Sequence, residues 1–280
     1  MIYRMLALNI DGAIIQSNSK ISRQTKAAID YVKSKGVVVT LVTSKPFLYA
    51  AKMAKILKVD GYLVTSDGAF VAKEKDQPFY YQRIEEVQAE EMVDILERYE
   101  CHIRLYHENY SLGNKMKEKK QLLAKMTLEL DEPRFYPLTF VDSVYEKLLE
   151  QPMAPLKIQA QFYRENDREL AITQIKEMNQ SFLIIKGKNN QLEVMKEGVS
   201  KAQSLRMLAQ FLEIKLEDMV AVGVSEHDIE MIQQAGLGVA MGNASHKVRQ
   251  EADWITRSTE EDGVSYMIKE VFRKQLRVQI

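Results

Sequence analysis

Cysteine is nearly absent from this chain of 280 residues, because Cys101 is the only one. A single thiol excludes an intrachain disulfide and any metal cluster built on several cysteines. No apolar run approaches the ~18–20 residues that a membrane-spanning helix needs. The first residues also form too short an apolar stretch for a secretory signal. We therefore expect a cytoplasmic protein that does not span a membrane.

An excess of charge is missing too. Lys and Arg number 39 and Asp and Glu number 39, so the formal net charge is 39 − 39 = 0. This balance gives no long-range attraction to nucleic acid or to an anionic membrane, so neither is expected as a partner. Hydrophobic residues at 46% and charged residues at 28% match a soluble globular protein. At about 150 residues per domain, the length predicts roughly two domains.

Strand and helix patterns alternate at both ends of the chain, as a parallel sheet with crossover helices requires. The apolar and β-branched runs predict strands, and the runs with apolar residues at helical spacing predict helices. The expected strands cover residues 5–9, 37–42, 62–65, 219–222 and 238–241, and the expected helices cover 25–35, 47–57, 201–212 and 228–235.

The middle of the chain has a different pattern, in which charged amphipathic segments alternate with half-polar strands and prolines. Helices are expected over 85–99 and 166–178, and strands over 102–106 and 157–162. The fold class predicted is α/β, with a Rossmann-like parallel-sheet core formed by residues 1–83 and 191–280. An α+β cap domain at 84–190 is inserted into it.

In open α/β sheets, ligands bind at the carboxyl ends of the strands. Four expected strand or helix ends carry suggestive residues, and each alone has an ordinary explanation as a turn, an N-cap or a solvated lysine. They are Asn9-Ile10-Asp11-Gly12, Thr43-Ser44-Lys45, Lys201, and the stretch from Gly223 to Asp228.

The order and spacing of these motifs together resemble the haloacid dehalogenase-like (HAD) superfamily. Within it, the chain looks closest to the Cof-type sugar-phosphate phosphatases with a large inserted cap, including their bacterial stress-response members. The resemblance covers nearly the whole chain. It is carried by Ala7-Leu8-Asn9-Ile10-Asp11-Gly12, Leu41-Val42-Thr43-Ser44-Lys45-Pro46, Thr65-Ser66-Asp67-Gly68-Ala69, Leu192-Glu193-Val194 with Gly198-Val199-Ser200-Lys201, Val222-Gly223 with Asp228-Ile229-Glu230-Met231, and Ala235-Gly236-Leu237-Gly238-Val239-Ala240-Met241-Gly242-Asn243-Ala244.

The resemblance implies a role for each position. An Asp at the place of Asn9 would attack phosphorus, and Asp11 would be the general acid and base. Thr43, Ser44 and Lys201 would hold the phosphoryl oxygens. Mg²⁺ would lie between the nucleophile, the backbone carbonyl of Asp11 and the acidic residues of the last motif, here Asp228. The cap would select a small phosphorylated substrate.

This sequence departs from that pattern at the nucleophile position and in the motif that would hold the metal. Asn9 stands at the nucleophile position, and its neutral amide is a far poorer nucleophile than a carboxylate. In the motif Gly-Asp-x-x-Asn-Asp, Val224 replaces the first Asp and His227 replaces the Asn. Valine offers no atom to Mg²⁺, which requires oxygen ligands. We therefore predict a weak or absent metal site at Asn9, Asp11 and Asp228, and little or no hydrolysis.

Three functions remain open at this point. The first is a degenerate phosphatase relative that binds phosphate or a phosphorylated metabolite. The second is a slow Mg²⁺-dependent phosphatase with a substitute ligand, Glu226 or His227. The third is a non-catalytic module that meets a protein partner. His102 and His107 fall in the expected cap, where they could touch substrate, but exposed polar strand positions are the favoured interpretation.

Overall fold

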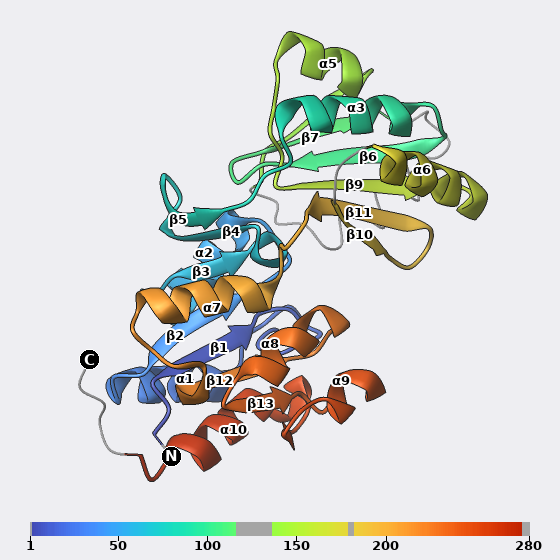
Figure 1. The fold of residues 1–280 in the computed structure, drawn as a ribbon. Helices are drawn as coiled ribbons and strands as arrows, with labels where there is room; N and C mark the ends of the chain where they lie inside the picture. The colour runs from blue at the N-terminus through green and yellow to red at the C-terminus, as the bar shows by residue number, and fades with distance from the viewer. Residues whose placement is uncertain (1, 116–135, 179–181, 276–280) are drawn as a thin grey trace. The chain divides into compact units, whose positions relative to one another are not determined.

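The computed structural model describes residues 2–115, 136–178 and 182–275. The chain forms two compact units, each built around its own sheet (Figure 1). The core unit consists of Met1–Ser44, Ala50–Tyr80 and Ser200–Ile280. The cap unit consists of Lys45–Tyr49 and Tyr81–Val199.

The core unit contains an eight-stranded sheet in the order β14-β13-β12-β1-β2-β3-β4-β5. The strands from β14 to β3 pair in parallel, and β4 turns back antiparallel to β3. This confirms the predicted α/β class with a parallel-sheet core. The strands are β1 (Met5–Asn9), β2 (Val38–Val42), β3 (Leu63–Thr65), β4 (Phe70–Glu74), β5 (Gln77–Tyr81), β12 (Met219–Gly223), β13 (Leu237–Ala240) and β14 (Trp254–Ile255).

The central strands are buried on both faces, and this is why their sequences are apolar without alternation. All five residues of β1 are buried. Helices α1 and α10 contact each other, as do α7 and α8. The helices of this part are α1 (Arg23–Ser34), α2 (Phe47–Leu57), α7 (Lys201–Phe211), α8 (Ile229–Gln234), α9 (His246–Gln250) and α10 (Gly263–Phe272).

The cap unit contains a six-stranded sheet in the order β10-β11-β9-β6-β7-β8. Helices α3 (Glu86–Glu97), α5 (Val144–Glu150) and α6 (Glu165–Glu177) cover one face of it (Figure 1). The pairing is antiparallel except between β7 and β8. The strands are β6 (Cys101–Tyr106), β7 (Ser111–Asn114), β8 (Leu138–Val141), β9 (Lys157–Phe162), β10 (Phe182–Lys186) and β11 (Gln191–Lys196).

The return from the cap unit to the core unit differs from the boundary expected at residue 190. β11 lies between β10 and β9 in the cap sheet, and the core unit resumes at Ser200. The pairing of β11 with β9 joins segments about thirty residues apart, and a local pattern does not reveal such a pairing. No helix among the described residues is long and apolar enough to cross a membrane.

Candidate active site

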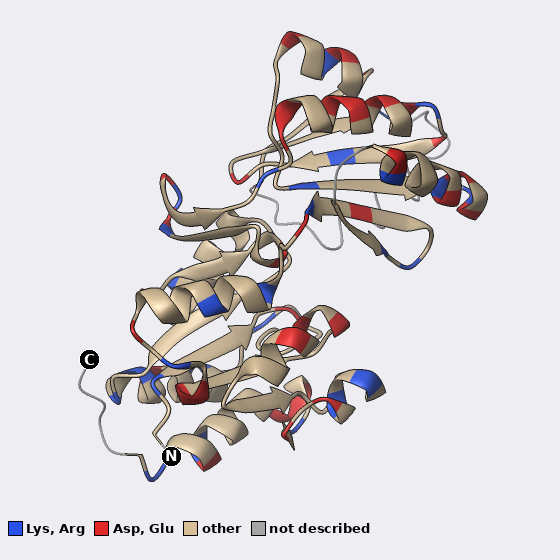
Figure 2. Cartoon of the chain, viewed as in Figure 1, with Lys and Arg blue, Asp and Glu red and all other residues tan. Residues whose placement is uncertain are grey.

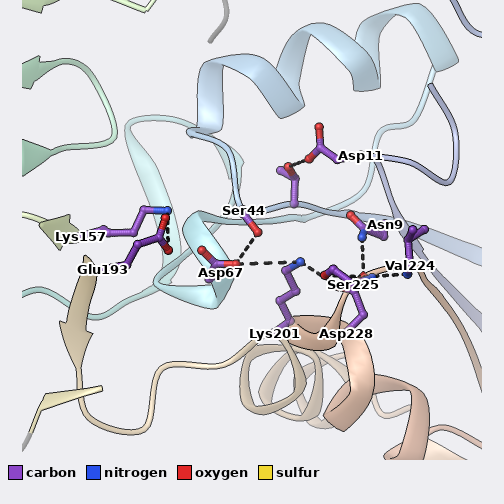
Figure 3. A network of polar contacts seen from close by, with 11 residues as sticks. Asn9, Asp11, Ser44, Asp67, Lys157, Glu193, Lys201, Val224, Ser225 and Asp228 are labelled. Carbon is purple, nitrogen blue, oxygen red and sulfur yellow. Dashed lines mark hydrogen bonds and ion pairs between the residues drawn. The ribbon is translucent and has the colours of Figure 1, made fainter. Parts of the chain in front are cut away.

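Polar residues meet at one edge of the core sheet because four neighbouring strands end there. β1 ends at Asn9, and β2 is followed by Thr43 and Ser44. β3 leads into a short 3₁₀ turn at Ser66–Gly68, and β12 leads into residues 224–228. The carboxyl ends of parallel neighbours lie side by side. Figure 3 shows the polar network that results.

Asn9 is 3% exposed, and its two amide atoms have different surroundings. The Nδ2 group donates a hydrogen bond of 2.6 Å to Oδ2 of Asp228. The Oδ1 atom is buried and has no hydrogen-bond partner among the described residues. In Figure 3 the amide nitrogen points to Asp228 and the oxygen points away from it. A carboxylate only accepts hydrogen bonds, so Asp228 fixes which way the amide is turned.

Asp228 is completely buried and receives donors on both carboxylate oxygens. Oδ1 accepts from Nζ of Lys201 at 2.8 Å. Oδ2 accepts from the backbone N–H groups of Val224 and Ser225, both at 2.9 Å, and from Oγ of Ser225 at 3.1 Å, besides Asn9. A buried carboxylate needs this many donors to remain charged without water.

The Lys201–Asp228 pair is held in its charged form. Burial by itself would lower the pKa of the Lys201 ammonium, but the carboxylates of Asp228 and Asp67 outweigh burial and raise that pKa. Burial would likewise raise the pKa of Asp228, but Lys201 and the backbone N–H groups lower it. Both directions favour an ammonium next to a carboxylate. Ser200 caps α7 and makes Lys201 its first residue.

Asp67 brings a second carboxylate to Lys201, at 4.0 Å from Nζ. It accepts a hydrogen bond from Oγ of Ser44 and is 4% exposed. Ser66, Asp67 and Gly68 all have positive φ, at 51°, 58° and 99°. A Cβ on Gly68 would lie 2.3 Å from the Ser200 carbonyl oxygen, so only glycine permits this turn to pack against the start of α7.

Asp11 and Thr43 form a third contact of the site, because Oγ1 of Thr43 donates to Oδ2 of Asp11 at 2.5 Å. The loop after β1, which contains Asp11 and Gly12, is held in place at the carbonyl oxygen of Gly12. That oxygen accepts from Nδ2 of Asn243 at 2.9 Å and from the hydroxyl of Thr259. The structure thus brings the predicted site residues together at this edge of the core sheet. They are Asn9, Asp11, Thr43, Ser44, Lys201 and Asp228.

The side chain of Val224 lies in an apolar environment. It packs against the small apolar cluster of Ile232, Ala240, Ala244 and Val248. A Cβ placed on Gly12 would lie 3.2 Å from Cγ1 of Val224, so the two residues are in close contact. An isopropyl group therefore occupies the position where an acidic side chain would face the loop after β1.

Comparisons with known proteins agree with this architecture. Residues 6–268 match the family model of the haloacid dehalogenase-like hydrolases. The chain is 44% identical over 275 residues to the stress response protein YhaX of Bacillus subtilis, covering 98% of this chain and 95% of that protein. The chain belongs to the haloacid dehalogenase-like hydrolase family. The predicted resemblance to its Cof-type branch is confirmed.

More distant relatives carry phosphatase names. The chain is 26% identical to the 5-amino-6-(5-phospho-D-ribitylamino)uracil phosphatase YcsE of B. subtilis, covering 95% of this chain and 94% of that protein. A crystal structure of a haloacid dehalogenase-like hydrolase from Bacteroides thetaiotaomicron superimposes with a TM-score of 0.82 at 20% identity. It covers 96% of this chain and all of the other, and this likeness shows the fold alone.

The Mg²⁺ that the family implies does not fit the donor set of this chain. Both oxygens of Asp228 are occupied by N–H, O–H and ammonium donors. Asn9 directs its NH₂ group, not its oxygen, toward Asp228, and Val224 has no ligand atom. Among the described residues, no group of three or more His, Cys, Asp or Glu side chains could hold a metal ion. Mg²⁺ requires several oxygens in near-octahedral geometry, which this set does not supply.

The substitute ligands considered from the sequence do not change this conclusion. Glu226 and His227 are both exposed. The Glu226 carboxylate forms an ion pair of 2.7 Å with Lys247, and this contact lowers the pKa of Glu226. Neither residue supplies what Val224 lacks.

The favoured interpretation of His102 was wrong, because this residue is buried and only 3% exposed. It lies on β6, on the face opposite the helices, because side chains alternate along a strand and the neighbouring Cys101 and Ile103 belong to the helix-covered core. Burial and the positive charge of Arg104 lower the pKa of its imidazole to about 4. His107 is partly exposed, and its Nδ1 lies 3.1 Å from Glu108.

Two site residues were missed from the sequence. Asp67 was seen only as part of a family motif, although its carboxylate faces Lys201. Ser225 was not singled out, yet it supplies two donors to Asp228. The signal available for Asp67 was an Asp-Gly pair directly after a buried strand, in the same position as Asp11-Gly12. The two Asp-Gly pairs follow strands of one sheet, which favours a shared edge.

Proposed function

We propose that this protein binds inorganic phosphate or the phosphate group of a small phosphorylated metabolite at the edge of the core sheet. Little or no hydrolysis accompanies binding, and no divalent cation is required. By analogy with its 44% identical relative, which is named a stress response protein, we propose a role in a stress response. A cytoplasmic location remains the expectation from the sequence.

The observation that carries this proposal is the hydrogen bond from Asn9 to Asp228. A carboxylate at position 9 would repel Asp228 unless a cation lay between them. The carboxamide replaces that repulsion with attraction, and Lys201 supplies the positive charge on the other oxygen. The arrangement is therefore stable as it stands, whereas an attack on phosphorus would require an anionic nucleophile.

The donors expected of an anion site support the binding half of the proposal. The hydroxyl groups of Thr43 and Ser44 and the ammonium of Lys201 come from different elements and converge at this edge, where they donate to Asp11, Asp67 and Asp228. On binding, a phosphoryl oxygen would replace the carboxylate as the acceptor of each hydroxyl. The backbone N–H groups of Gly12 and Ala13 donate to no acceptor among the described residues. Consecutive N–H groups in a loop with a left-handed residue form concave anion sites, and Gly12 has φ of 74°.

The ligand class follows from the relatives and from the chemistry of the donors. The YcsE relative is named as a phosphatase of a phosphorylated small molecule. Hydroxyl, ammonium and N–H donors suit phosphoryl oxygens and carry no preference for the rest of the molecule. We therefore propose a small phosphorylated metabolite, with its identity set elsewhere in the chain.

Isothermal titration calorimetry with inorganic phosphate and a panel of sugar phosphates tests this function, in buffer with EDTA. We expect binding that Lys201→Gln weakens by at least about tenfold, because hydrogen bonds to charged groups contribute about 1.5–3 kcal/mol. Lys215→Gln is the matched control, since Lys215 is an exposed lysine outside the site. Circular dichroism verifies folding, and Thr43→Val serves if Lys201→Gln does not fold.

A phosphate-release assay tests the absence of turnover. We expect no release from p-nitrophenyl phosphate or the sugar phosphates above the buffer rate, with or without Mg²⁺. Turnover of about 1 s⁻¹ or faster, which is ordinary for an enzyme, would contradict the proposal. Mg²⁺-stimulated release would favour the slow phosphatase instead. Failure of every phosphate compound to bind would favour a protein-interaction role.

A further inference from the structure

One buried atom of the site is an acceptor without a partner. Oδ1 of Asn9 belongs to a residue that is 3% exposed, and no donor among the described residues reaches it. The amide cannot turn over to relieve this, because Nδ2 would then leave Asp228 and Oδ1 would face a carboxylate. Leaving a buried acceptor unsatisfied is unfavourable. A ligand that brought a hydrogen-bond donor to this atom would remove that unfavourable contribution.

The charges around Asn9 also bear on which ligand the site favours. The groups that the core unit presents are the carboxylates of Asp11 after β1, Asp67 after β3 and Asp228 after β12, and the ammonium of Lys201 on α7. His227 next to Asp228 is exposed. With the three carboxylates ionised, these groups sum to −2. A dianionic ligand meets more repulsion here than a monoanion of the same shape.

We propose that the site selects a phosphate group that still carries a proton, whose P–OH donates to Oδ1 of Asn9. This inference rests on the proposed function and deepens it. A protonated phosphate satisfies both observations, because it brings the missing donor and carries one negative charge less than the dianion. Sulfate has the same shape but carries no proton at neutral pH, so the site rejects it.

The experiment compares phosphate with sulfate by calorimetry in metal-free buffer at pH 5.5 and 7.5. We expect phosphate to bind at least about tenfold more tightly than sulfate at pH 5.5, because sulfate leaves the buried acceptor of Asn9 without a hydrogen-bond donor. A sugar phosphate should bind about twentyfold more weakly at pH 7.5 than at pH 5.5, because the second pKa of a phosphate monoester is about 6. Sulfate keeps one charge state across this range, so its profile records any titration of the protein itself.

A variant at position 9 tests the acceptor. Asn9→Leu removes the acceptor, together with the donor to Asp228, and should bring the two affinities within about threefold of each other. Lys215→Gln, at an exposed lysine outside the site, should keep the preference for phosphate over sulfate. If Asn9→Leu does not fold, the wild-type comparison of the two anions and its pH profile still decide the question.

The outcomes separate this inference from the proposed function. If neither phosphate nor sugar phosphates bind at either pH, the proposed function itself fails. If phosphate binds but sulfate binds equally well, or if phosphate binds more tightly at pH 7.5 than at pH 5.5, the site exists but does not select the protonated form.

Discussion

Each unit holds a buried lysine paired with a carboxylate, and the two pairs differ in how completely they are enclosed (Figure 3). In the core unit, Lys201 and Asp228 are 2.8 Å apart, with side chains 2% and 0% exposed. In the cap unit, Lys157 on β9 and Glu193 on β11 are 3.5 Å apart, with side chains 8% and 16% exposed. The core pair is shorter and fully removed from solvent.

The difference follows from how each sheet is covered. The strands of the core sheet are almost free of charged residues, whereas β6, β9 and β11 of the cap sheet carry them (Figure 2). Core strands have helices on both faces, so charge enters only where the strands end. The cap sheet has helices on one face, and its other face carries Arg104, Lys157 and Glu193 along the strands. Buried charges thus lie at the ends of the strands in the core sheet, whereas in the cap sheet they lie along one face of the strands.

The largest effect that separates the two pairs is expected from Lys201→Met. Removing one partner of a fully buried ion pair leaves the other charge without compensation and typically lowers the free energy of unfolding by about 3–5 kcal/mol. Urea unfolding of the variant and the wild type at pH 7 measures it. A loss below about 1 kcal/mol would mean that the N–H donors and Asn9 alone stabilise Asp228.

A second test concerns the metal. Because the donors around Asp228 leave it no free oxygen, 5 mM Mg²⁺ should leave the melting temperature of the wild type unchanged. In Asn9→Asp/Val224→Asp two carboxylates return, and a cation becomes the group that relieves their repulsion. Mg²⁺ at about 100 times its Kd should then stabilise the variant by about 2.7 kcal/mol.

Differential scanning fluorimetry of both proteins with and without Mg²⁺ measures this response, and Ca²⁺ can be compared in the same plate. A clear Mg²⁺ shift in the wild type would show that Asp228 exchanges its present donors for a cation. The absence of any shift in the double variant would mean that Lys201 still supplies the positive charge.

The two units should also lose stability in different pH windows. In the folded state the pKa of His102 is about 4, below its ordinary value of about 6.5. Between these two pH values, His102 is protonated in the unfolded chain but neutral in the folded chain. Stability from this group is present above pH 6.5 and is lost as the pH falls toward 4, by about 3 kcal/mol, because each unit of pKa difference corresponds to about 1.4 kcal/mol. The pKa of Asp228 is also lowered, from an ordinary value near 3.9, so its contribution is lost only below about pH 4.

Hydrogen exchange at pH 7, 5.5 and 4.5 can follow each unit separately. Protection of the cap strands should fall before that of the core strands. His102→Gln should flatten the decline in the cap between pH 6.5 and 4, whereas His246→Gln, at an exposed position of α9, should not. Equal loss of protection in both units over this range would contradict the assignment to His102.

Local patterns predicted much of this fold, and their failures share one cause. The helix at 47–57 and the strand at 157–162 coincide with α2 and β9, because continuous apolar runs and alternation are local signals. β4 and β5 were not predicted, and β11 was expected in the core, because their assignment depends on pairing partners. Which candidate residues would share the core edge was predictable from strand ends. The direction of the Asn9 amide and the burial of His102 depend on neighbours distant in sequence and were not.

The smallest measurable effect is expected from Lys157→Met in the cap unit. Its partner Glu193 keeps 16% side-chain exposure, so water can solvate the carboxylate once the ammonium is gone. The ammonium of Lys157 also lies over the ring of Tyr106, with Nζ 5.4 Å from the ring centroid, and a cation–π contact of this kind contributes only about 0.5–1 kcal/mol. We expect a loss of about 1 kcal/mol in urea unfolding.

A double-mutant cycle with Glu193→Gln should give a coupling of similar size. Lys247→Met, which breaks the exposed pair with Glu226, should change nothing measurable. If Lys157→Met instead destabilised the protein as much as Lys201→Met, the face of the cap sheet would be as closed to water as the core edge, and the contrast between edge and face would be lost.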